Sequence, residues 1–431
     1  MSQGGGAARA RVEAALDAAE ADVAGINAFI TVDREGALEA ADVADARAAA
    51  GRSLGPLDGV PVAVKDSLDT AGLRTTFGSG MYAHRVPERD AEAVMRLRAA
   101  GAAIVGKTNM TELACGTFGK NEWFGDCHNP HDTSRYPGGS SSGSAASVAA
   151  GIVDHAVGSD TSCSIRQPAA VCGVVGLKPT YGRVSAKGNS ICSPHLDHVG
   201  PIGATVDAAA DLLSALQEPG WGNVGANPLD AGELPTLRIG VLGGPFVDAC
   251  AADVGRVTAS AIDLVGELGH RLVDVDLGLD LVEVDELANV LCADMIEAYG
   301  QDVADAPPDR VGASLRNWFD IFGESIDRYD EALAMQRHVT AHIESVMAER
   351  ELDVLLCAAT RVGAGLLADA DEDRQLRMGN LAIWDMTGQP SLTVPCGAAE
   401  TGMPLGLLFN GRRGDDALVL RLGRQFERAR S

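Results

Sequence analysis

Residues 137–168 constrain the fold and the chemistry of this chain more than any other stretch. They begin with one serine-rich, glycine-flanked loop at 137–144 (PGGSSSGS) and end with a second at 158–168 (GSDTSCSIRQP). Between the loops lie a small-residue segment at 145–151, long enough for a helix, and a short apolar run at 152–157. Glycines let other groups approach the main chain closely, and a loop that opens onto a helix directs backbone N–H groups at whatever lies above it. We therefore expect the two loops to form a nucleophile site.

The composition is typical of a globular protein with a large core, because 46% of the 431 residues are apolar and 22% are charged. This length allows one large α/β domain or two or three smaller ones. The formal net charge is −25, whereas binding to phosphate groups needs clustered Lys and Arg. We therefore expect neither nucleic acid nor a membrane surface as a partner.

The nine cysteines favour a reducing compartment, because their number is odd and no C-x-x-C pair suggests a disulfide framework or a zinc site. The start of the chain lacks the basic and apolar segments of a secretory signal. No apolar run approaches the ~20 residues that span a bilayer. The sequence thus predicts a cytoplasmic protein without a bound metal or cofactor.

Strands that alternate with helices predict an α/β fold with a mixed or largely parallel sheet. The strands are expected at 60–66, 102–107, 237–242, 354–357, 391–394 and 405–409. The helices are expected at 90–100, 205–217, 251–268, 417–429 and over most of 280–350, with long loops at 117–136 and 180–200. An Ala-rich helical pattern at 7–50, broken at 26–32, predicts an N-terminal arm of two helices that carries no chemistry.

A catalytic serine needs a base, because an alcohol is a poor nucleophile at neutral pH. Neither serine loop contains a histidine, and His155, in the apolar run between them, is expected to be a core residue. Lys65 is the best placed of the five lysines, since it lies at the end of the apolar strand at 60–66. If Lys65 is buried, its pKa falls toward neutrality and it can serve as the base. If it reaches the surface at the strand end, it has no such role.

Two familiar motifs are disfavoured. Residues 139–143 match G-x-S-x-G with Ser141 at the centre, but the nucleophile elbow of α/β-hydrolases needs a strand that runs directly into it. Residues 129–137 precede this motif and have the composition of a loop. A phosphate-binding loop needs a G-K-[ST] ending, which residues 137–144 lack.

Residues 55–205 resemble the amidase signature family, which contains amidases and the A subunits of glutamine-dependent amidotransferases. The order and spacing of the motifs both fit: GVPVAVKD at 59–66, GKTNMTE at 106–112, the two serine loops, GVVGLKPTYGR at 173–183 and DHVGP at 197–201. The C-terminal half resembles the family more loosely, through residues 388–395 and 402–406.

This resemblance implies an amidase-signature fold, in which helices cover both faces of a central mixed β-sheet. It also implies a single domain, residues 1–431, with a helical arm at 1–50, the signature core at 55–205 and a substrate-specificity and C-terminal part at 237–431. Specificity is expected from the segments where the match is weakest, at 115–130, 190–196 and 290–390.

The family's catalytic triad carries over residue by residue: Ser164 is the expected nucleophile, Ser140 the bridging serine and Lys65 the terminal base. In the family the bridging serine follows a cis peptide bond, which here is Gly139–Ser140. The implied reaction is acyl transfer, in which Lys65 takes a proton from Ser140, and Ser140 takes one from Ser164 as Ser164 attacks the amide carbonyl. The oxyanion is expected to bind backbone N–H groups of the loop before the nucleophile: Thr161, Ser162, Cys163 and Ser164.

Other positions are expected to support the site. The resemblance implies that three residues brace the loops: Ser141, Asp160 and Arg166. Three residues are expected to bind substrate: Ala114, Cys115 and Gly116. Lys107 and Lys178 also match family positions, and we expect them to form structural salt bridges. Arg361 or Arg374 could bind a substrate carboxylate, although a surface position is the better interpretation for both.

The chain departs from the family directly before the nucleophile, where Ser162-Cys163 replaces the usual Gly-Gly. The oxyanion donors are main-chain groups, so these side chains need not abolish the hole, but we expect them to shift its geometry or narrow the pocket. Cys163 has no histidine partner in either loop, so we interpret it as a small pocket-wall residue rather than a thiol nucleophile.

The sequence as a whole predicts an amidohydrolase that cleaves the C–N bond of a small-molecule carboxamide through a Ser-Ser-Lys triad and an acyl-enzyme. We expect it to act as a monomer or homodimer. One alternative is the glutaminase subunit of a tRNA-dependent amidotransferase, against which stand the acidic composition and the loose C-terminal match. The other is a catalytically weak or silent member of the family, which the Ser162-Cys163 departure suggests.

Overall fold

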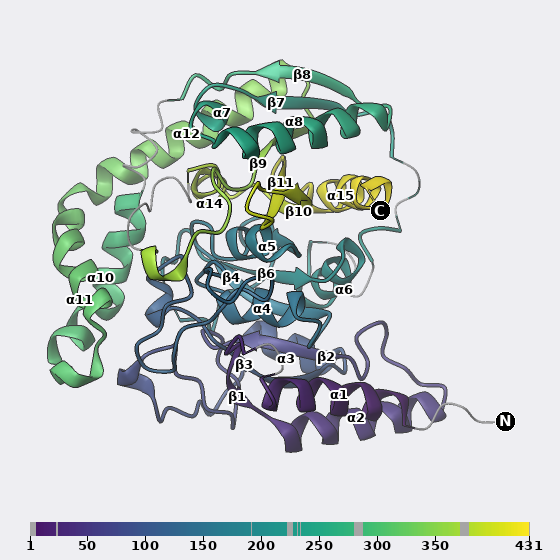
Figure 1. The fold of residues 1–431 in the computed structure, drawn as a ribbon, viewed down its shortest axis with the longest axis vertical. Helices are drawn as coiled ribbons and strands as arrows, with labels where there is room; N and C mark the ends of the chain where they lie inside the picture. Colours follow the sequence, from purple (N-terminus) through teal and green to yellow (C-terminus); the bar gives the residue numbers. More distant parts are fainter. Residues whose placement is uncertain are drawn as a thin grey trace.

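A computed structural model gives the structure of the chain, and it describes residues 6–22, 25–190, 192–221, 227–230, 232, 234–279, 288–370 and 379–430, without the side chains of 288 and 321–325. An 11-stranded mixed sheet runs through the molecule in the order β1-β3-β2-β4-β6-β5-β10-β11-β9-β7-β8. Helices cover both faces of this sheet, so the predicted α/β architecture is confirmed (Figure 1).

The strands are β1 (Phe29–Val32), β2 (Pro61–Lys65), β3 (Ala103–Thr108), β4 (His155–Asp160), β5 (Val175–Lys178), β6 (His198–Gly203), β7 (Arg238–Leu242), β8 (Arg271–Val275), β9 (Val354–Ala358), β10 (Ser391–Ala398) and β11 (Pro404–Gly411). The helices are α1 (Ala7–Glu20), α2 (Arg34–Ala49), α3 (Glu92–Ala99), α4 (Ser142–Ala149), α5 (Arg166–Cys172), α6 (Val206–Leu216), α7 (Pro245–Asp248), α8 (Ala252–Glu267), α10 (Ala288–Asp305), α11 (Ala313–Phe322), α12 (Tyr329–Glu349), α14 (Ala382–Met386) and α15 (Asp416–Arg430).

Alternate residues of the central strand β2 contribute to the two halves of the core. Val62 and Val64 pack on one face of the sheet with residues of α3, α6 and α15. Ala63 packs on the other face with residues of α1, α2 and α4. Since successive side chains of a strand point to opposite faces, Lys65 lies on the same face as Ala63. This is the face that carries α4 and the serine loop before it.

Small residues let α4 lie directly against neighbouring backbone. A Cβ atom at Gly143 would lie 2.2 Å from the carbonyl oxygen of Ala28 and 2.5 Å from the backbone nitrogen of Asn109. The Gly143 N–H also donates to the Asn109 carbonyl oxygen at 2.9 Å. No side chain fits at position 143, so the glycine that follows the serines fixes how closely α4 approaches the sheet.

Several strands differ from the prediction. The expected break at 26–32 contains β1, which pairs with β3 and ties the N-terminal arm into the sheet. The apolar run at 152–157 leads into β4, and the expected loop at 180–200 ends in β6. β5 and β8 are also absent from the predicted set. β4 has the sequence HAVGSD, and pairing with β2 on one side and β6 on the other holds it extended despite its few apolar side chains.

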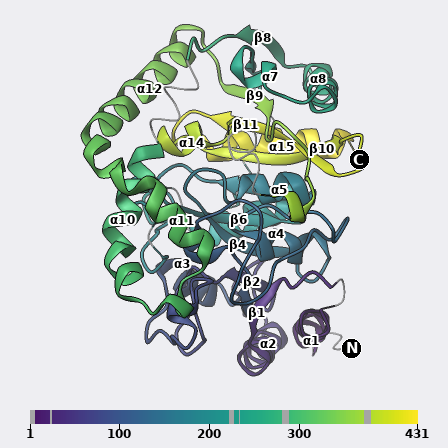
Figure 2. The same cartoon turned by 60° about the vertical axis from the view of Figure 1, so that its left-hand side comes forward.

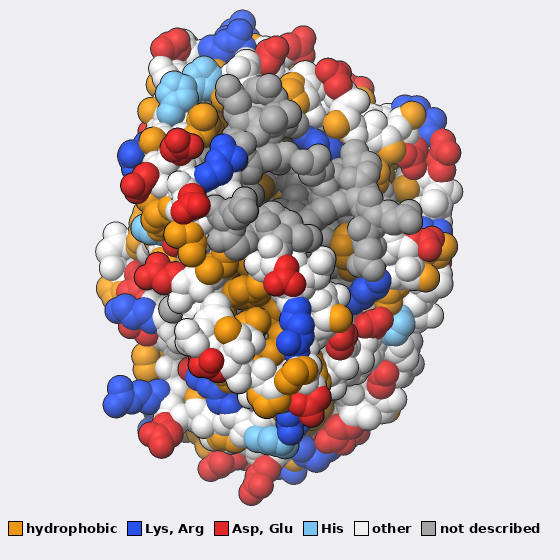
Figure 3. All heavy atoms as spheres, turned by 90° about the vertical axis from the view of Figure 1, so that its left-hand side faces the viewer, with side chains coloured by type: hydrophobic (Ala, Val, Ile, Leu, Met, Phe, Trp, Pro, Cys, Tyr) orange, Lys and Arg blue, Asp and Glu red, His pale blue; other side chains and the backbone are white. Residues whose placement is uncertain are grey.

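The helical region predicted at 280–350 forms α10, α11 and α12, while residues 280–287 lie outside the described chain. These three helices run along one side of the molecule (Figure 2). On the described part of the face that carries them, Lys and Arg side chains are scattered among Asp and Glu (Figure 3). No helix within the described ranges is long and apolar enough to cross a membrane.

Candidate active site

Two parallel strands bring the predicted base and the predicted nucleophile loop to one place. β2 and β4 are neighbours in the sheet, with Val64 opposite Val157. Parallel strands end at the same edge, so Lys65, the last residue of β2, lies beside the end of β4, where the loop at 161–165 begins. In open α/β sheets, ligands bind at the carboxyl ends of the strands. The candidate site occupies this position.

Lys65 is fully buried, and its amine has three hydrogen-bond partners. Nζ lies 2.7 Å from Ser140 Oγ, 2.8 Å from Ser159 Oγ and 3.4 Å from the Ser159 carbonyl oxygen. Burial lowers the pKa of Lys65 to about 8, although the negative charges of Asp160 and Asp197 oppose this shift. A neutral amine in this position donates its two N–H groups to Ser159 and keeps its lone pair for the Ser140 proton. The surface alternative for Lys65 is therefore wrong.

The first serine loop is tied to β4 and to the second loop. The Gly139–Ser140 peptide bond is cis. The Ser141 N–H donates to the carbonyl oxygen of Ser164 at 3.2 Å, and the Ser141 hydroxyl donates to the carbonyl oxygen of Ser159 at 3.2 Å. Ser141 thus makes the contacts of a residue that braces the two loops.

Ser164 Oγ forms no hydrogen bond with any described residue, and its side chain lines a small cavity. The Lys65–Ser140 link of the predicted relay is therefore present, whereas the link between the Ser140 and Ser164 hydroxyls is not formed. The backbone bond from Ser141 to Ser164 keeps the two loops in contact. Catalytic hydrogen bonds often tighten only when substrate binds, so the relay requires these two hydroxyls to meet in the substrate complex.

The predicted oxyanion donors lie in the loop between β4 and α5. The backbone N–H groups of residues 161–164 donate to no acceptor in the described chain. The next two N–H groups, those of Ile165 and Arg166, donate to Asp160 Oδ2 at 3.0 and 3.3 Å. The Asp160 carboxylate therefore accepts a hydrogen bond from none of the four predicted donor N–H groups. These groups are available to a substrate oxygen.

A network of buried ion pairs holds the loop between β4 and α5 in place. Arg166 Nε donates to Asp160 Oδ2 at 2.9 Å, and its Nη2 contacts Asp385 Oδ2 and donates to the Ser162 carbonyl oxygen at 3.3 Å. All three charged side chains are fully buried. The Arg166 guanidinium overcomes the effect of burial and holds the pKa of Asp160 well below its usual range. Asp160 and Arg166, both predicted as supporting residues, thus hold the backbone on either side of Ser164, the predicted nucleophile.

The cavity at Ser164 measures about 20 Å³ and brings distant parts of the chain together. The residues that line it are Ala114, Cys115, Gly116, Thr117, Thr161, Ser162, Ser164, Cys192, Leu291, Met295 and Trp318. The three residues expected to bind substrate are among them. The walls from α10 and α11 belong to the segment at 290–390, from which specificity was expected, but the individual residues Leu291, Met295 and Trp318 were not predicted.

Neither Cys163 nor His155 has the surroundings of a catalytic group. Burial raises the pKa of Cys163 to about 12, so its thiol stays protonated at neutral pH. His155 starts β4 and packs into the sheet, where burial lowers its pKa, and neither ring nitrogen has a hydrogen-bond partner among the described residues.

Two residues at the site were missed by sequence reasoning. Ser159 binds the Lys65 amine through both its hydroxyl and its carbonyl oxygen, and it was overlooked because β4 was not predicted as a strand. The Asp197 carboxylate accepts hydrogen bonds from Thr161 Oγ1 at 2.8 Å and from the Cys192 N–H at 2.9 Å. Burial raises the pKa of Asp197 to about 6. Its position in the DHVGP motif was the only available signal.

The other buried cations have structural partners. Lys107 pairs with Asp66 at 3.5 Å, as expected of a structural salt bridge. Lys178 donates instead to two backbone carbonyl oxygens, those of Gln389 at 2.6 Å and Pro179 at 3.1 Å, so its predicted salt bridge is wrong. Arg361 is buried, with Nε donating to Asn380 Oδ1 at 3.0 Å, so its predicted surface position is also wrong. Arg374 lies outside the described residues.

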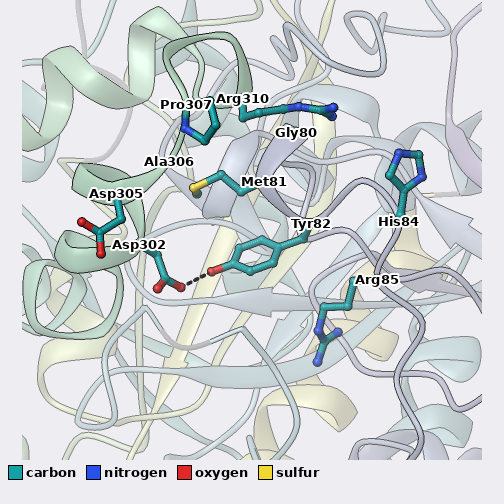
Figure 4. A pocket seen from close by; sticks show the side chains of 10 residues that line it. All are labelled: Gly80, Met81, Tyr82, His84, Arg85, Asp302, Asp305, Ala306, Pro307 and Arg310. Atoms are coloured by element: carbon teal, nitrogen blue, oxygen red, sulfur yellow. Dashed lines mark hydrogen bonds between the residues drawn. The ribbon is translucent and has the colours of Figure 1, made fainter.

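A second cavity, of about 640 Å³, lies between residues 80–85 and the end of α10 (Figure 4). The Tyr82 hydroxyl points at Asp302 there and donates to its Oδ2 at 2.5 Å. Among the described residues this cavity shares no lining side chain with the cavity at Ser164.

No group of three or more His, Cys, Asp or Glu side chains in the described chain is arranged to hold a metal ion.

Residues 10–420 match a sequence model of the family described as Amidase. The chain belongs to the amidase family. The resemblance inferred from the serine loops and the lysine strand is therefore confirmed. This amidase-family chain is 38% identical over 452 aligned residues to the A subunit of the glutamyl-tRNA(Gln) amidotransferase of Anaeromyxobacter dehalogenans (strain 2CP-C), with 97% of this chain and 92% of that protein covered.

Solved structures of the family have the same fold as this chain. One, described as a crystal structure of amidase, has a TM-score of 0.88 at 30% identity and covers 98% of this chain and 96% of its own. Another, the peptide amidase of Stenotrophomonas maltophilia, has a TM-score of 0.84 at 28% identity and covers 98% and 94%.

Proposed function

We propose that this amidase-family chain hydrolyses the C–N bond of a small-molecule carboxamide through Lys65, Ser140 and Ser164. The observation that carries the proposal is the buried Lys65 amine, 2.7 Å from Ser140 Oγ and with a pKa of about 8. A lysine desolvated in this way is neutral often enough to act as a base near neutral pH.

In the proposed reaction, Lys65 Nζ accepts the Ser140 proton while Ser140 Oγ accepts the Ser164 proton. Ser164 Oγ then bonds to the amide carbon, and the carbonyl oxygen, now negative, binds the N–H groups of residues 161–164. The C–N bond breaks as the nitrogen takes the proton back along the same route and leaves as ammonia or an amine. Water attacks the acyl-enzyme, gives a proton to the relay and releases the carboxylic acid with Ser164 restored.

The experiment is a screen of carboxamides that measures released ammonia or amine for the wild type and for Ser164→Ala. We expect the substitution to lower the rate by at least ~10³-fold, because removing a nucleophile leaves only binding and oxyanion stabilisation. Ser53→Ala, an exposed serine in a loop, is the matched control and should keep full activity. Hydrolysis that survives in Ser164→Ala at the wild-type rate would overturn the proposal.

A second candidate function is supported by the 38% identity to an amidotransferase A subunit. In that function the chain would release ammonia from glutamine and pass it to a partner subunit. Ammonia release from glutamine that rises when a co-purified second subunit is added would favour it. Hydrolysis of other carboxamides by the isolated chain, with no response to such a subunit, would favour the stand-alone hydrolase.

A further inference from the structure

The space beside the proposed nucleophile, Ser164, is too small for a substrate. It measures about 20 Å³, which is room for about one water molecule. A carboxamide group has three heavy atoms, so it reaches Ser164 only if one wall of this cavity moves. The walls differ in how the rest of the chain holds them.

Most of the cavity walls are tied into the core by polar contacts. The buried ion pairs described above hold the loop at 161–164. The carbonyl oxygen of Thr117 accepts a hydrogen bond from Gln167 Nε2 at 3.1 Å. In α10, the buried carboxylate of Asp294 accepts a hydrogen bond from the Ser193 hydroxyl. These walls move only if contacts inside the core break.

The helix α11 is attached differently. Its main neighbours are α10 and the short helix Gly323–Arg328, at the side of the molecule (Figure 2). Leu315 and Trp318, about one turn apart, pack into an apolar cluster. Trp318 lines the Ser164 cavity, and both side chains line an outer cleft of about 550 Å³. Displacement of α11 therefore widens the cavity toward this cleft.

Two glutamates of the segment after β3 hold the first residues of α11. Glu112 is buried, and its Oε2 accepts a hydrogen bond from the Gly312 N–H at 3.0 Å. Glu122 is exposed, and its carboxylate accepts hydrogen bonds from the N–H groups of Ala313 and Ser314, each at 3.2 Å. Carboxylates at the first N–H groups of a helix stabilise its start. The two side chains thus fix where α11 begins.

Glu112 is itself held from the side of the core. Its other oxygen, Oε1, accepts hydrogen bonds from Ser79 Oγ at 2.7 Å and from Trp123 Nε1 at 2.9 Å. The fit against α11 is close, because a Cβ atom at Gly312 would lie 2.4 Å from Glu112 Oε2 and 3.1 Å from Glu122 Oε1. Glu112 therefore sets the position of α11 from a fixed place.

We infer that Glu112 and Glu122 are positioning residues that hold α11 closed over the Ser164 cavity until a substrate displaces it. The inference rests on the proposed function for the role of Ser164 and adds how access to this site is controlled. Weaker capping raises the fraction of open molecules, and with it the reactivity of groups inside the cavity. A role in stability alone would lower the thermal midpoint without this gain.

The experiment measures the alkylation of Cys192 by iodoacetamide, followed by peptide mass spectrometry, because Cys192 is buried and lines the cavity. In Glu122→Ala we expect alkylation to be about fivefold faster, the effect of losing one capping interaction. Gly312→Ala, which forces Glu112 away, should act in the same direction. Glu122→Gln keeps an acceptor oxygen and should lie between the wild type and Glu122→Ala.

Two controls separate local opening from unfolding. Cys172 in α5 is also fully buried, but it is not among the described residues that line the cavity. Its alkylation in the same digest should stay at the wild-type rate. Asp33→Ala removes a carboxylate that caps α2 through the Gly36 N–H at 3.0 Å, and it should leave the alkylation of Cys192 unchanged.

Labelling of Ser164 by a fluorophosphonate should rise by a similar factor in Glu122→Ala. Unchanged or slower alkylation of Cys192 in either Glu122→Ala or Gly312→Ala would overturn this inference and leave the proposed function intact. Equal acceleration at Cys172 would also overturn it, because that result reports unfolding. Faster alkylation of Cys192 with no labelling of Ser164 in any variant would overturn the proposed function and support the movable wall.

Discussion

Protonation of Lys65 should stop amide hydrolysis, and the structure gives the pH range in which this occurs. With a pKa of about 8, the fraction of neutral amine is about one half at pH 8 and about 1% at pH 6. If kcat/KM follows the neutral amine, it rises about 50-fold over this range and levels off above it. An ordinary lysine, with a pKa near 10.5, would still be rising beyond pH 10.

The pH profile alone does not identify the lysine, because burial also lowers the pKa of Lys107 to about 8 and that of Lys178 to about 7. The Asp197→Asn variant distinguishes titration of Lys65 from titration of Lys107 or Lys178. The negative charges of Asp160 and Asp197 raise the pKa of Lys65, against the larger effect of burial. Removing the charge of Asp197 should lower the pKa of Lys65 further, so the rise in kcat/KM should move to lower pH.

The assay is the initial rate of ammonia release from a primary carboxamide between about pH 5.5 and pH 10. Lys65→Met should abolish the rise together with the activity, whereas Lys107→Met should leave its midpoint near pH 8. A wild-type profile that is flat between pH 6 and 9, or an Asp197→Asn profile shifted to higher pH, would refute the reasoning. The sign of the second result is decisive, because only the loss of a nearby negative charge predicts a shift to lower pH.

Three further predictions test the surroundings of the relay. Ser159→Ala removes a hydroxyl 2.8 Å from Lys65 Nζ and should lower kcat about fivefold, since one hydrogen bond contributes about 1 kcal/mol; an unchanged kcat would show that Ser159 does not orient the amine. Arg166→Met leaves two buried carboxylates without their cation and should cost about 3–5 kcal/mol, seen as a lower thermal midpoint. Arg256→Met, in an exposed pair, is its control and should cost less than about 1 kcal/mol; equal losses would contradict the account. Gly143→Ala should also lower the thermal midpoint, because the added Cβ would lie 2.2 Å from a carbonyl oxygen. Its control is Gly255→Ala, in which the added Cβ meets nothing within 4 Å. That control should raise the free energy of unfolding by roughly 0.5–1 kcal/mol.

Local sequence signals predicted the strand that ends at Lys65 and the first serine loop, but they left open whether Lys65 is buried or reaches the surface. Lys65 ends a β-branched run, and such a run predicts a buried strand without reference to any partner. The glycines at 138 and 139 predicted close backbone approach, and a Cβ at Gly138 would lie 2.6 Å from the Cα of Pro168.

Features fixed by partners were not predictable in this way. β4 reads HAVGSD, and it becomes a strand because β2 and β6 lie on either side of it. With β4 unrecognised, Ser159 could not be placed on the same edge of the sheet as Lys65. Periodicity likewise does not specify that Met295 and Trp318, more than 130 positions after Ser164, form the far wall of its cavity.

Side-chain orientation also lies beyond sequence reasoning. The motif predicted a continuous relay, whereas the structure contains the Lys65–Ser140 hydrogen bond but not the bond from Ser140 to Ser164. A serine rotamer depends on its immediate neighbours, and a spacing of 24 residues along the chain carries no information about it.

The most direct test of the relay is to react the protein with a fluorophosphonate, locate the adduct by peptide mass spectrometry and follow its rate of formation against pH. We predict a single adduct on Ser164 that forms faster as the pH rises through about 8, and a rate in Lys65→Met that is far lower and independent of pH. An adduct on Ser140, Ser162 or Cys115, or a Lys65→Met variant that labels as fast as the wild type, would contradict the account.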